Sequence, residues 1–421
     1  MIHTPQTPEF ALPQLFEWIS HSERWVDNES LNLYAGTNRQ SAAVRRAMAT
    51  TLNARPSLGQ PGDKYETGLA FSDLIEEWAE QQLCGLFGVR RVEYRVLSGS
   101  LANLYAYMAT TRPGDGIYAM SESLAGHATH HQHGAAGLYG LHVIPIPHQP
   151  GTHLIDWDAW AKEITTVRPK LIILGTSLPL LPVDIGRAHE LARTVNAHVM
   201  YDAAHVAALV ATGRFQRPIA EGASLLTMST YKTFGGPAGG LVATNDIALA
   251  DRLDKIAYPG LTANFDMARV AALGVAALEL QRFGPAYADQ CLRNAQKLAE
   301  DLRTRNIPVW LPDGTHATQS HIIAIAAQKF GGGTHAARLA EASNVLFSGI
   351  PLPLDPCDGD YNGIRLGVQE LTRLGMREGD MTPVAEFISR ALNRPDQAEI
   401  TRGDVGAFRQ QFQTIKFGFS D

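Results

Sequence analysis

The sequence predicts an α/β protein in which helices cover both faces of a mostly parallel sheet, followed by a smaller C-terminal α/β domain. Short apolar runs alternate with amphipathic helical stretches between residues 115 and 245, and this pattern changes after about residue 305. Strands of a parallel sheet are buried on both faces and therefore read as nearly continuous apolar runs. The 421 residues are enough for two to three domains of roughly 150 residues each.

The N-terminal third begins with a proline-containing segment and then becomes helical. Residues 1–30 contain Phe10, Phe16 and Trp18, and we expect an arm that packs on another subunit or on its own core, or else a loosely tied terminus. Helical periodicity spans 71–88, and the turn SGSLAN at 98–103 precedes a second helical run.

The middle of the chain supplies the predicted sheet. Helices are expected at 155–167 and 186–196, between strands at 115–120, 141–147, 169–177, 198–205, 225–232 and 239–245. Sheets of this kind bind ligands at the carboxyl ends of their strands. Polar residues that directly follow these apolar runs are therefore candidates for a site.

A long helical region at about 265–305 leads into the C-terminal part, which has strand-like runs at 321–328 and 363–368 around a proline-rich stretch. From this change of pattern we predict an N-terminal arm at 1–30, a large domain at 31–285 and a small domain at 286–421.

Composition restricts the class of partner. The net charge is −6, so the chain offers no positive field for nucleic acid or anionic lipid, and a small molecule is the expected partner. No apolar stretch approaches the ~20 residues that cross a bilayer, and the N-terminus lacks a signal-peptide pattern. We therefore expect a cytoplasmic protein. Three widely spaced cysteines suggest neither disulfides nor zinc.

Three segments carry candidate chemistry, and each has an ordinary structural alternative. SGSLAN could hold a phosphate at a helix N-terminus or simply cap that helix. Asp202 ends an apolar run just before His205, and a buried carboxylate there needs a cation, either a protonated heterocycle or a salt-bridge partner. Lys232 follows another apolar run, either exposed on a loop or engaged as a Schiff base.

In this order the segments resemble the serine hydroxymethyltransferase family of pyridoxal-phosphate (PLP) enzymes, which have the aspartate-aminotransferase type fold (fold type I) with a mostly parallel seven-stranded sheet. The resemblance follows LNLYAG at 31, SGSLAN, GHATHH at 126, RPKLIILGTS at 168, YDAAHVAALV at 201, STYKTFGGPAGG at 229, AYPGL at 257, GIRLG at 363 and EFISRAL at 386. It implies PLP as the cofactor, an L-amino acid as the substrate and a homodimer with a shared active site.

The resemblance also implies roles for individual residues. Lys232 would form the Schiff base, and Asp202 would pair with the pyridinium nitrogen so that the cofactor can accept electrons from Cα. Arg365 would bind the substrate carboxylate through a bidentate fork, with a surface arginine as the alternative. The catalytic set would be Lys232, Asp202, His127 and Tyr65, and the cofactor would contact Ser98, Gly99, Ser100, His127, Asp202, His205, Thr230, Tyr231 and Lys232.

The histidine-rich segment GHATHHQHG raises the question of a metal site. It contains His127, His130, His131 and His133, but their spacing matches no closed zinc site and no cysteine is nearby. We predict no metal, and stacking of His127 on the cofactor explains that residue.

Several positions depart from the family pattern, chiefly around the substrate. Where the family has a proton-handling glutamate, the frame set by Gly59, Pro61 and Gly62 places Leu58, and of the following tyrosine pair only Tyr65 remains, beside Glu66. A leucine cannot shuttle protons. The other departures are Pro56, Gln60, Gly36-Thr37-Asn38, Tyr231, Leu180, Ala263 and Asn264.

These departures predict a PLP-dependent lyase or transferase of specialised metabolism that acts at Cα or Cβ of a β-substituted L-amino acid without folate. Aldol-type cleavage or transaldolation and β-elimination remain open. The alternatives are decarboxylation with or without deamination of an amino-acid conjugate, a true serine/glycine hydroxymethyltransferase, a transaminase, or a PLP-binding scaffold without activity.

Overall fold

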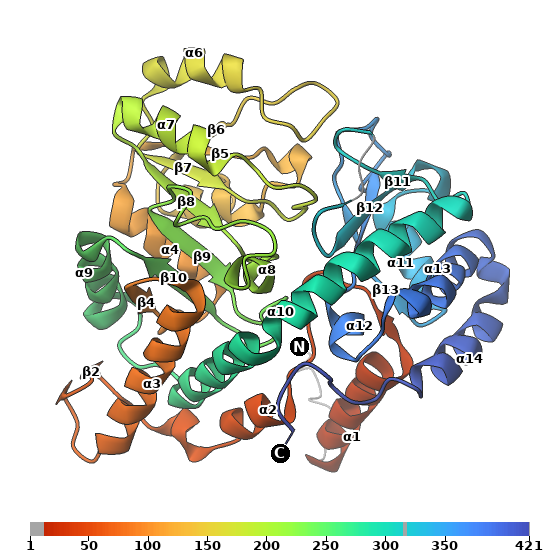
Figure 1. The fold of residues 1–421 in the computed structure, drawn as a ribbon, viewed down its shortest axis with the longest axis horizontal. Helices are drawn as coiled ribbons and strands as arrows, with labels where there is room; N and C mark the ends of the chain where they lie inside the picture. Colours follow the sequence, from red (N-terminus) through yellow and green to blue (C-terminus); the bar gives the residue numbers. More distant parts are fainter. Residues whose placement is uncertain (1–11, 315–317, 421) are drawn as a thin grey trace, which may run out of the picture.

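Seven strands form the main sheet of the computed structural model, which describes residues 12–314 and 318–420 (Figure 1). In spatial order they are β4 (Arg91–Glu93), β10 (Gly240–Thr244), β9 (Leu225–Ser229), β8 (His198–Asp202), β7 (Leu171–Leu174), β5 (Gly116–Ala119) and β6 (His142–Pro145). Pairing is parallel from β9 through β6, whereas β10 runs antiparallel to both β9 and β4. The predicted strands and the mostly parallel sheet are confirmed.

Helices cover both faces because alternate side chains of each strand point to opposite sides. Leu171 and Ile173 belong to one apolar core, and Ile172 and Leu174 belong to the other. The first core includes residues of α4 (Gly99–Thr110), α5 (Ala135–Leu138) and α9 (Ile247–Lys255). The second includes residues of α2 (Ala42–Met48), α3 (Ala70–Phe87), α6 (Trp157–Val167), α7 (Ile185–Val195), α8 (Ala207–Ala211) and α10 (Met267–Thr304).

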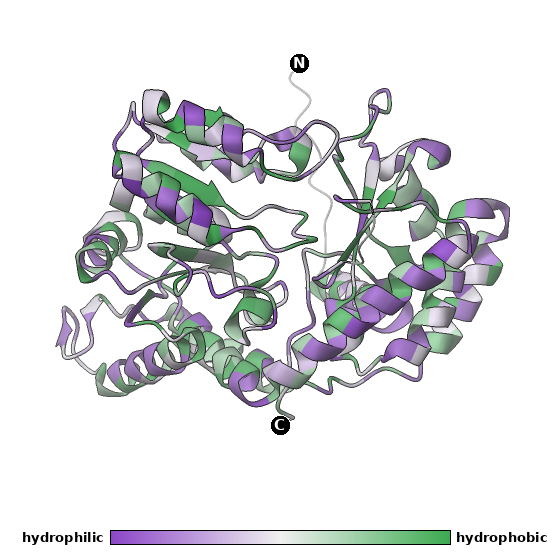
Figure 2. Ribbon diagram, turned by 45° about the horizontal axis from the view of Figure 1, so that its top comes forward, coloured by the Kyte–Doolittle hydropathy of each residue, from purple (hydrophilic) through white to green (hydrophobic). Residues whose placement is uncertain are grey.

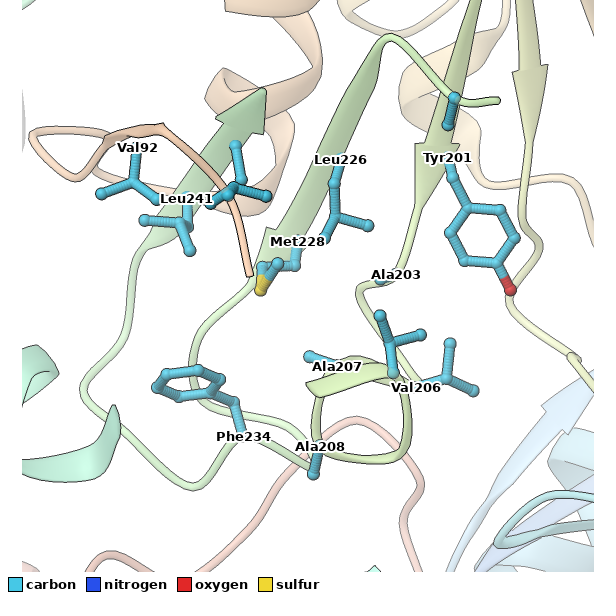
Figure 3. Packing of buried hydrophobic residues seen from close by; sticks show 14 of the residues in the cluster. Val92, Tyr201, Ala203, Val206, Ala207, Ala208, Leu226, Met228, Phe234 and Leu241 are labelled. Carbon is cyan, nitrogen blue, oxygen red and sulfur yellow. The ribbon is translucent and has the colours of Figure 1, made fainter. Parts of the chain in front are cut away.

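The pictures show the same layering. In Figure 2 the main strands are largely hydrophobic and the outer helices carry hydrophilic stripes. Figure 3 shows part of the second core, where Leu226, Met228 and Leu241 of the sheet lie near Phe234 and Ala207. The burial of Phe234 anchors the turn that follows Lys232, so packing of the core helps to position that lysine.

Local sequence determines where the covering helices begin and end. The carboxylates of Asp156 and Asp184 accept backbone N–H groups at the starts of α6 and α7. Each helix ends at a residue with positive φ, Arg168 or Asn196, which turns the chain into the next strand. These caps bring β7 and β8 into register side by side.

The part of the chain that follows α10 is called the small part below, and the part with the main sheet and its helices is called the large part. The small part has its own antiparallel sheet, in the order β11 (Val309–Trp310), β12 (Ile322–Ala326), β15 (Gly363–Gly367) and β14 (Ser348–Ile350). Its helices are α11 (Gly333–Glu341), α12 (Gln369–Arg373), α13 (Glu378–Asn393) and α14 (Ala398–Arg409). Helix α10 runs from the large part into this one, so the predicted boundary at 285/286 falls inside a continuous helix. The domain limits remain a prediction.

The N-terminal segment packs partly on the small part. Strand β1 (Leu31–Asn32) pairs parallel to β13 (Val345–Leu346), and Leu31 and Leu33 lie in the small part's core. The Trp25 indole donates to Asn344 Oδ1 over 2.9 Å. In α1 (Leu12–Glu23), Phe16 and Trp18 are exposed, whereas Phe10 lies outside the described residues.

Among the described residues, no helix combines the length and the apolar character needed to cross a membrane. Cys84, Cys291 and Cys357 are all free thiols in the structure.

Candidate active site

Lys232 lies buried just beyond the end of β9, and its Nζ is 3.2 Å from His205 Nε2. Burial lowers the pKa of the amine to about 8; Asp202 opposes this effect and Arg365 adds to it. Burial, with help from Lys232 and Arg365, also lowers the pKa of His205 well below its usual range. The alternative of an exposed loop lysine is wrong, and the amine is suited to attack a carbonyl.

Asp202, the last residue of β8, is a buried carboxylate held by three hydrogen-bond contacts. Its Oδ2 accepts from Asn103 Nδ2 at 3.0 Å and lies 3.1 Å from His130 Nε2, while Oδ1 accepts the Ala204 N–H at 2.9 Å. Burial alone raises its pKa, but the His130 hydrogen bond and the other contacts outweigh burial and keep the pKa below its ordinary value. No lysine or arginine within the described ranges forms a salt bridge with Asp202, so a cationic ring nitrogen is a suitable partner.

The residues that orient Asp202 were not predicted from the sequence. The Tyr107 hydroxyl lies 2.6 Å from His130 Nδ1, so Tyr107, His130 and Asp202 form a buried hydrogen-bonded chain. Thr227 donates to Asn103 Oδ1 over 2.8 Å and fixes the amide that contacts Asp202. From its sequence position, His130 was a candidate only for a metal site, and no group of side chains suited to a metal ion occurs among the described residues.

His127 follows β5 and begins a short 3-10 turn at Ala128–His130. Its Nδ1 accepts the Thr129 N–H at 3.3 Å and lies 2.8 Å from the Thr129 hydroxyl. Burial lowers its pKa to about 4, although Asp202 acts in the opposite direction. The ring is therefore neutral near pH 7, and its flat face can stack on an aromatic cofactor.

Ser98 and Gly99 lie at the start of α4, where a phosphate cradle was predicted, and that role remains a prediction. The Ser98 hydroxyl accepts the Leu101 N–H at 3.1 Å, so Ser98 is also the helix cap, and its own hydrogen remains available to an anion. A Cβ on Gly99 would lie 2.3 Å from Ser229 Oγ, so a larger residue where this helix meets the end of β9 would require the Ser229 side chain to move. Ser100 is exposed.

Thr230 and Tyr231 shape the loop that carries Lys232. The Thr230 hydroxyl donates to the Pro237 carbonyl over 2.6 Å, and the Thr230 carbonyl accepts the Gly236 N–H at 2.8 Å. Thr230 is buried and Tyr231 is half-buried. In this structure Thr230 stabilises the turn, and a direct contact of either residue with the cofactor remains a prediction.

Arg365, on β15, reaches back from the small part to the large one. Its Nη1 donates to the Ser177 carbonyl over 2.8 Å and its Nη2 to the Ser348 hydroxyl over 3.3 Å. Its Nε is buried and has no hydrogen-bond partner in the part of the chain that the structure describes. A buried guanidinium with a free donor is suited to a carboxylate. The alternative of a surface arginine is wrong, since only 7% of Arg365 is exposed.

Tyr65 lies apart from this cluster within the chain. It follows the hairpin of β2 (Gly59–Gln60) and β3 (Asp63–Lys64), which lies at the periphery beside α3 (Figure 1). Tyr65 is 82% exposed, and its N–H donates to the Leu58 carbonyl at 3.0 Å. Glu66 Oε2 accepts the Leu58 N–H at 3.0 Å. Catalysis by Tyr65 requires that the hairpin reach a partner subunit, and this role stays a prediction.

The cluster fits pyridoxal phosphate by its own chemistry. Lys232 can bind the aldehyde, Asp202 can pair with the ring nitrogen, the flat face of His127 can cover the ring, and the start of α4 can hold the phosphate. His205 Nδ1 is a further buried atom that lacks a partner among the described residues. The fold and the site define a PLP-dependent enzyme of fold type I.

Comparison with known proteins gives the family. The family model described as serine hydroxymethyltransferase matches residues 11–388. An alpha-methylserine aldolase of a Ralstonia species is 40% identical over 412 residues, 98% of this chain and 94% of the relative. Another alpha-methylserine aldolase, from Variovorax paradoxus, is 46% identical over 371 residues, 88% of this chain and 84% of the relative.

A serine hydroxymethyltransferase of Methanopyrus kandleri is 39% identical over 404 residues, 95% of this chain and 94% of the relative. The chain belongs to the serine hydroxymethyltransferase family. It is a PLP-dependent enzyme that acts on an amino acid, and the predicted fold and cofactor are confirmed.

The pKa of Lys232 predicts how cofactor capture depends on pH. Only the neutral amine attacks the aldehyde, and burial lowers the amine pKa to about 8. The rate at which apoenzyme captures PLP should therefore rise about tenfold per pH unit below that value and level off above it. Stopped-flow absorbance measures the rate, and N-acetyl-lysine, with a pKa of about 10.4, is the control. A capture rate that still rises steeply above pH 9.5 would show an ordinary lysine.

Proposed function

We propose that the chain cleaves the Cα–Cβ bond of a β-hydroxy amino acid that carries a substituent on Cα, with α-methylserine as the representative substrate, and that it does so without folate. The observation that carries the proposal is a cofactor and carboxylate cluster around Lys232, Asp202 and Arg365, combined with Leu58 where the family pattern predicts a glutamate. The names of the aldolase relatives support the same substrate.

The reaction can be written so that its atoms balance. The β-hydroxyl loses its proton, the Cα–Cβ bond breaks, formaldehyde leaves, and a proton added to Cα yields alanine. Bound PLP supplies an electron sink for the pair left on Cα. Arg365 holds the substrate carboxylate, and the negative charge of Asp202 favours a protonated nitrogen in the cofactor ring. The displaced Lys232 amine is the proposed proton carrier. These roles, and those of the other predicted site residues, are part of the proposal.

An α-methyl group limits which bonds can react. Because α-methylserine has no hydrogen on Cα, neither transamination nor a β-elimination that begins with removal of that proton is open to it. Only loss of the β-carbon or of the carboxylate remains. The Arg365 cluster favours loss of the β-carbon, since a carboxylate held by a guanidinium keeps its bond to Cα while the β-substituent is released.

The test is turnover of α-methyl-L-serine by the holoenzyme. We expect formaldehyde and alanine in equal amounts at the same rate with or without tetrahydrofolate, and slower cleavage of L-serine. Formaldehyde is assayed by a coupled dehydrogenase and alanine by chromatography. Rapid conversion of L-serine to glycine that depends on tetrahydrofolate would instead identify an ordinary hydroxymethyltransferase.

Assembly and location belong to the same proposal. We propose a homodimer in which the hairpin of one subunit carries Tyr65 and Leu58 to the site of its partner, and the exposure of Tyr65 and of Phe71 on the adjacent α3 supports this. We also propose a cytoplasmic location.

A further inference from the structure

Tyr34 covers the guanidinium of Arg365 at the edge of the candidate site. The Arg365 Cζ lies 5.8 Å from the centre of the Tyr34 ring, within the range of a cation–π contact. Tyr34 is 38% exposed whereas Arg365 is buried, so the contact joins a partly solvated ring to a buried guanidinium. Burial lowers the pKa of Arg365, while the charge and hydrogen-bonding capacity of the Tyr34 hydroxyl act in the opposite direction.

The position of the Tyr34 ring depends on Gly36. A Cβ on Gly36 would lie 2.8 Å from two ring carbons of Tyr34 and 2.9 Å from its hydroxyl oxygen. The ring therefore packs against the Gly36 backbone. It occupies the space that the Cβ of any larger residue at position 36 would need. The pair Tyr34 and Gly36 is present in the sequence as LNLYAG.

The turn that carries Tyr34 is tied to both parts of the molecule. Gln369 Nε2, on α12, donates to the carbonyls of Tyr34 and Thr37, each over 2.8 Å. Gln40 Nε2 donates over 3.1 Å to the Gly236 carbonyl, in the turn that follows Lys232. These contacts fix Tyr34 between the small part, which supplies Arg365, and the loop that supplies Lys232.

We propose that Tyr34, seated on Gly36, is a positioning residue for the α-carboxylate of the substrate. Its ring shields one face of the Arg365 guanidinium from water and directs the free Nε donor toward the bound carboxylate. The inference rests on the proposed function, because it takes Arg365 as the carboxylate ligand. A desolvated contact of this kind strengthens binding by roughly 3- to 30-fold.

The test compares a ligand that has the carboxylate with one that lacks it. The dissociation constants of L-alanine and L-alaninamide are measured by spectral titration of the holoenzyme and of the variants Tyr34→Leu, Tyr34→Phe and Gly36→Ala. We expect Tyr34→Leu and Gly36→Ala to weaken L-alanine binding by roughly 3- to 30-fold and to leave L-alaninamide unchanged. Tyr34→Phe keeps the ring and should bind like the original enzyme.

Two further variants sharpen the result. If both changes act through one ring, the double variant Tyr34→Leu/Gly36→Ala binds L-alanine no more weakly than Tyr34→Leu alone. Gly406→Ala, in α14, places a Cβ in open space and is the matched control. In Tyr34→Leu and in Gly36→Ala, the KM for α-methylserine should rise while kcat changes little.

The outcomes separate the inference from the function on which it rests. The role of Tyr34 is overturned if Tyr34→Leu weakens the binding of L-alanine and L-alaninamide equally, or if it does not weaken the binding of L-alanine. If Tyr34→Leu does not fold, the other two variants still test the inference, because it predicts weaker L-alanine binding for Gly36→Ala and unchanged L-alanine binding for Tyr34→Phe. If the original holoenzyme binds neither ligand, the proposed function is wrong, whatever the variants do.

Discussion

Lys232→Ala will abolish turnover of any amino acid, with a loss of at least about 10³-fold, because the carbonyl cofactor loses its covalent anchor and the site loses its amine. The effect follows from a buried Nζ whose one described hydrogen-bond contact is His205 Nε2 at 3.2 Å. The measurement is borohydride reduction of PLP-loaded enzyme followed by peptide mass analysis. The pyridoxyl label should be on the peptide that contains Lys232 and should be absent from the variant.

Lys170→Ala is the control, because Lys170 is exposed and lies just before β7. It should retain both label and activity. A label found on another lysine, or a Lys232→Ala enzyme within tenfold of the original activity, would contradict the assignment.

Asp202→Asn has the second largest expected effect. The amide keeps the size of the carboxylate but removes the charge that Asn103, His130 and the Ala204 N–H stabilise in the buried site. The bound cofactor then loses the partner that keeps its ring nitrogen protonated, and kcat should fall by roughly 10²- to 10⁴-fold. Label on Lys232 should persist, which separates this change from loss of cofactor.

Asp184→Asn is the matched control for Asp202→Asn. Asp184 caps α7 through the Arg187 N–H and does not contact Asp202 or Lys232 in the structure. Its variant should keep full activity. If Asp202→Asn retained more than half of the original kcat, the proposed pairing of Asp202 with the cofactor would be wrong.

Much of the fold was predictable because buried parallel strands leave a simple trace in the sequence. Runs such as that around Leu171–Leu174 are apolar along their length, and each was predicted. Strand β4 was missed because Arg91–Glu93 is short and has one apolar residue, Val92, in the core. The domain boundary at 285/286 stays a prediction, and it falls inside α10, where a helix that crosses two packing units shows one unbroken periodicity.

The candidate site was predictable where a residue type carries its own chemistry. Lys232, Asp202 and Arg365 are charged groups at strand ends or on a strand, and they are expensive to bury without function. His130, Asn103 and Tyr107 were missed because their role depends on contacts between α4, the His127 turn and β8, which no local spacing reveals. Tyr34 was missed for the same reason, since its contact with Arg365 joins residues far apart in the chain.

The fate of the β-carbon tests the central claim most directly. Holoenzyme is given α-methyl-L-serine labelled with ¹³C at the hydroxymethyl carbon (Cβ). The products are followed by ¹³C nuclear magnetic resonance without folate. The proposal predicts that all label moves to hydrated formaldehyde, while alanine forms unlabelled and no carbon dioxide is released. Label retained in a C3 amine or ketone, together with release of carbon dioxide, would show cleavage at the carboxylate and contradict it.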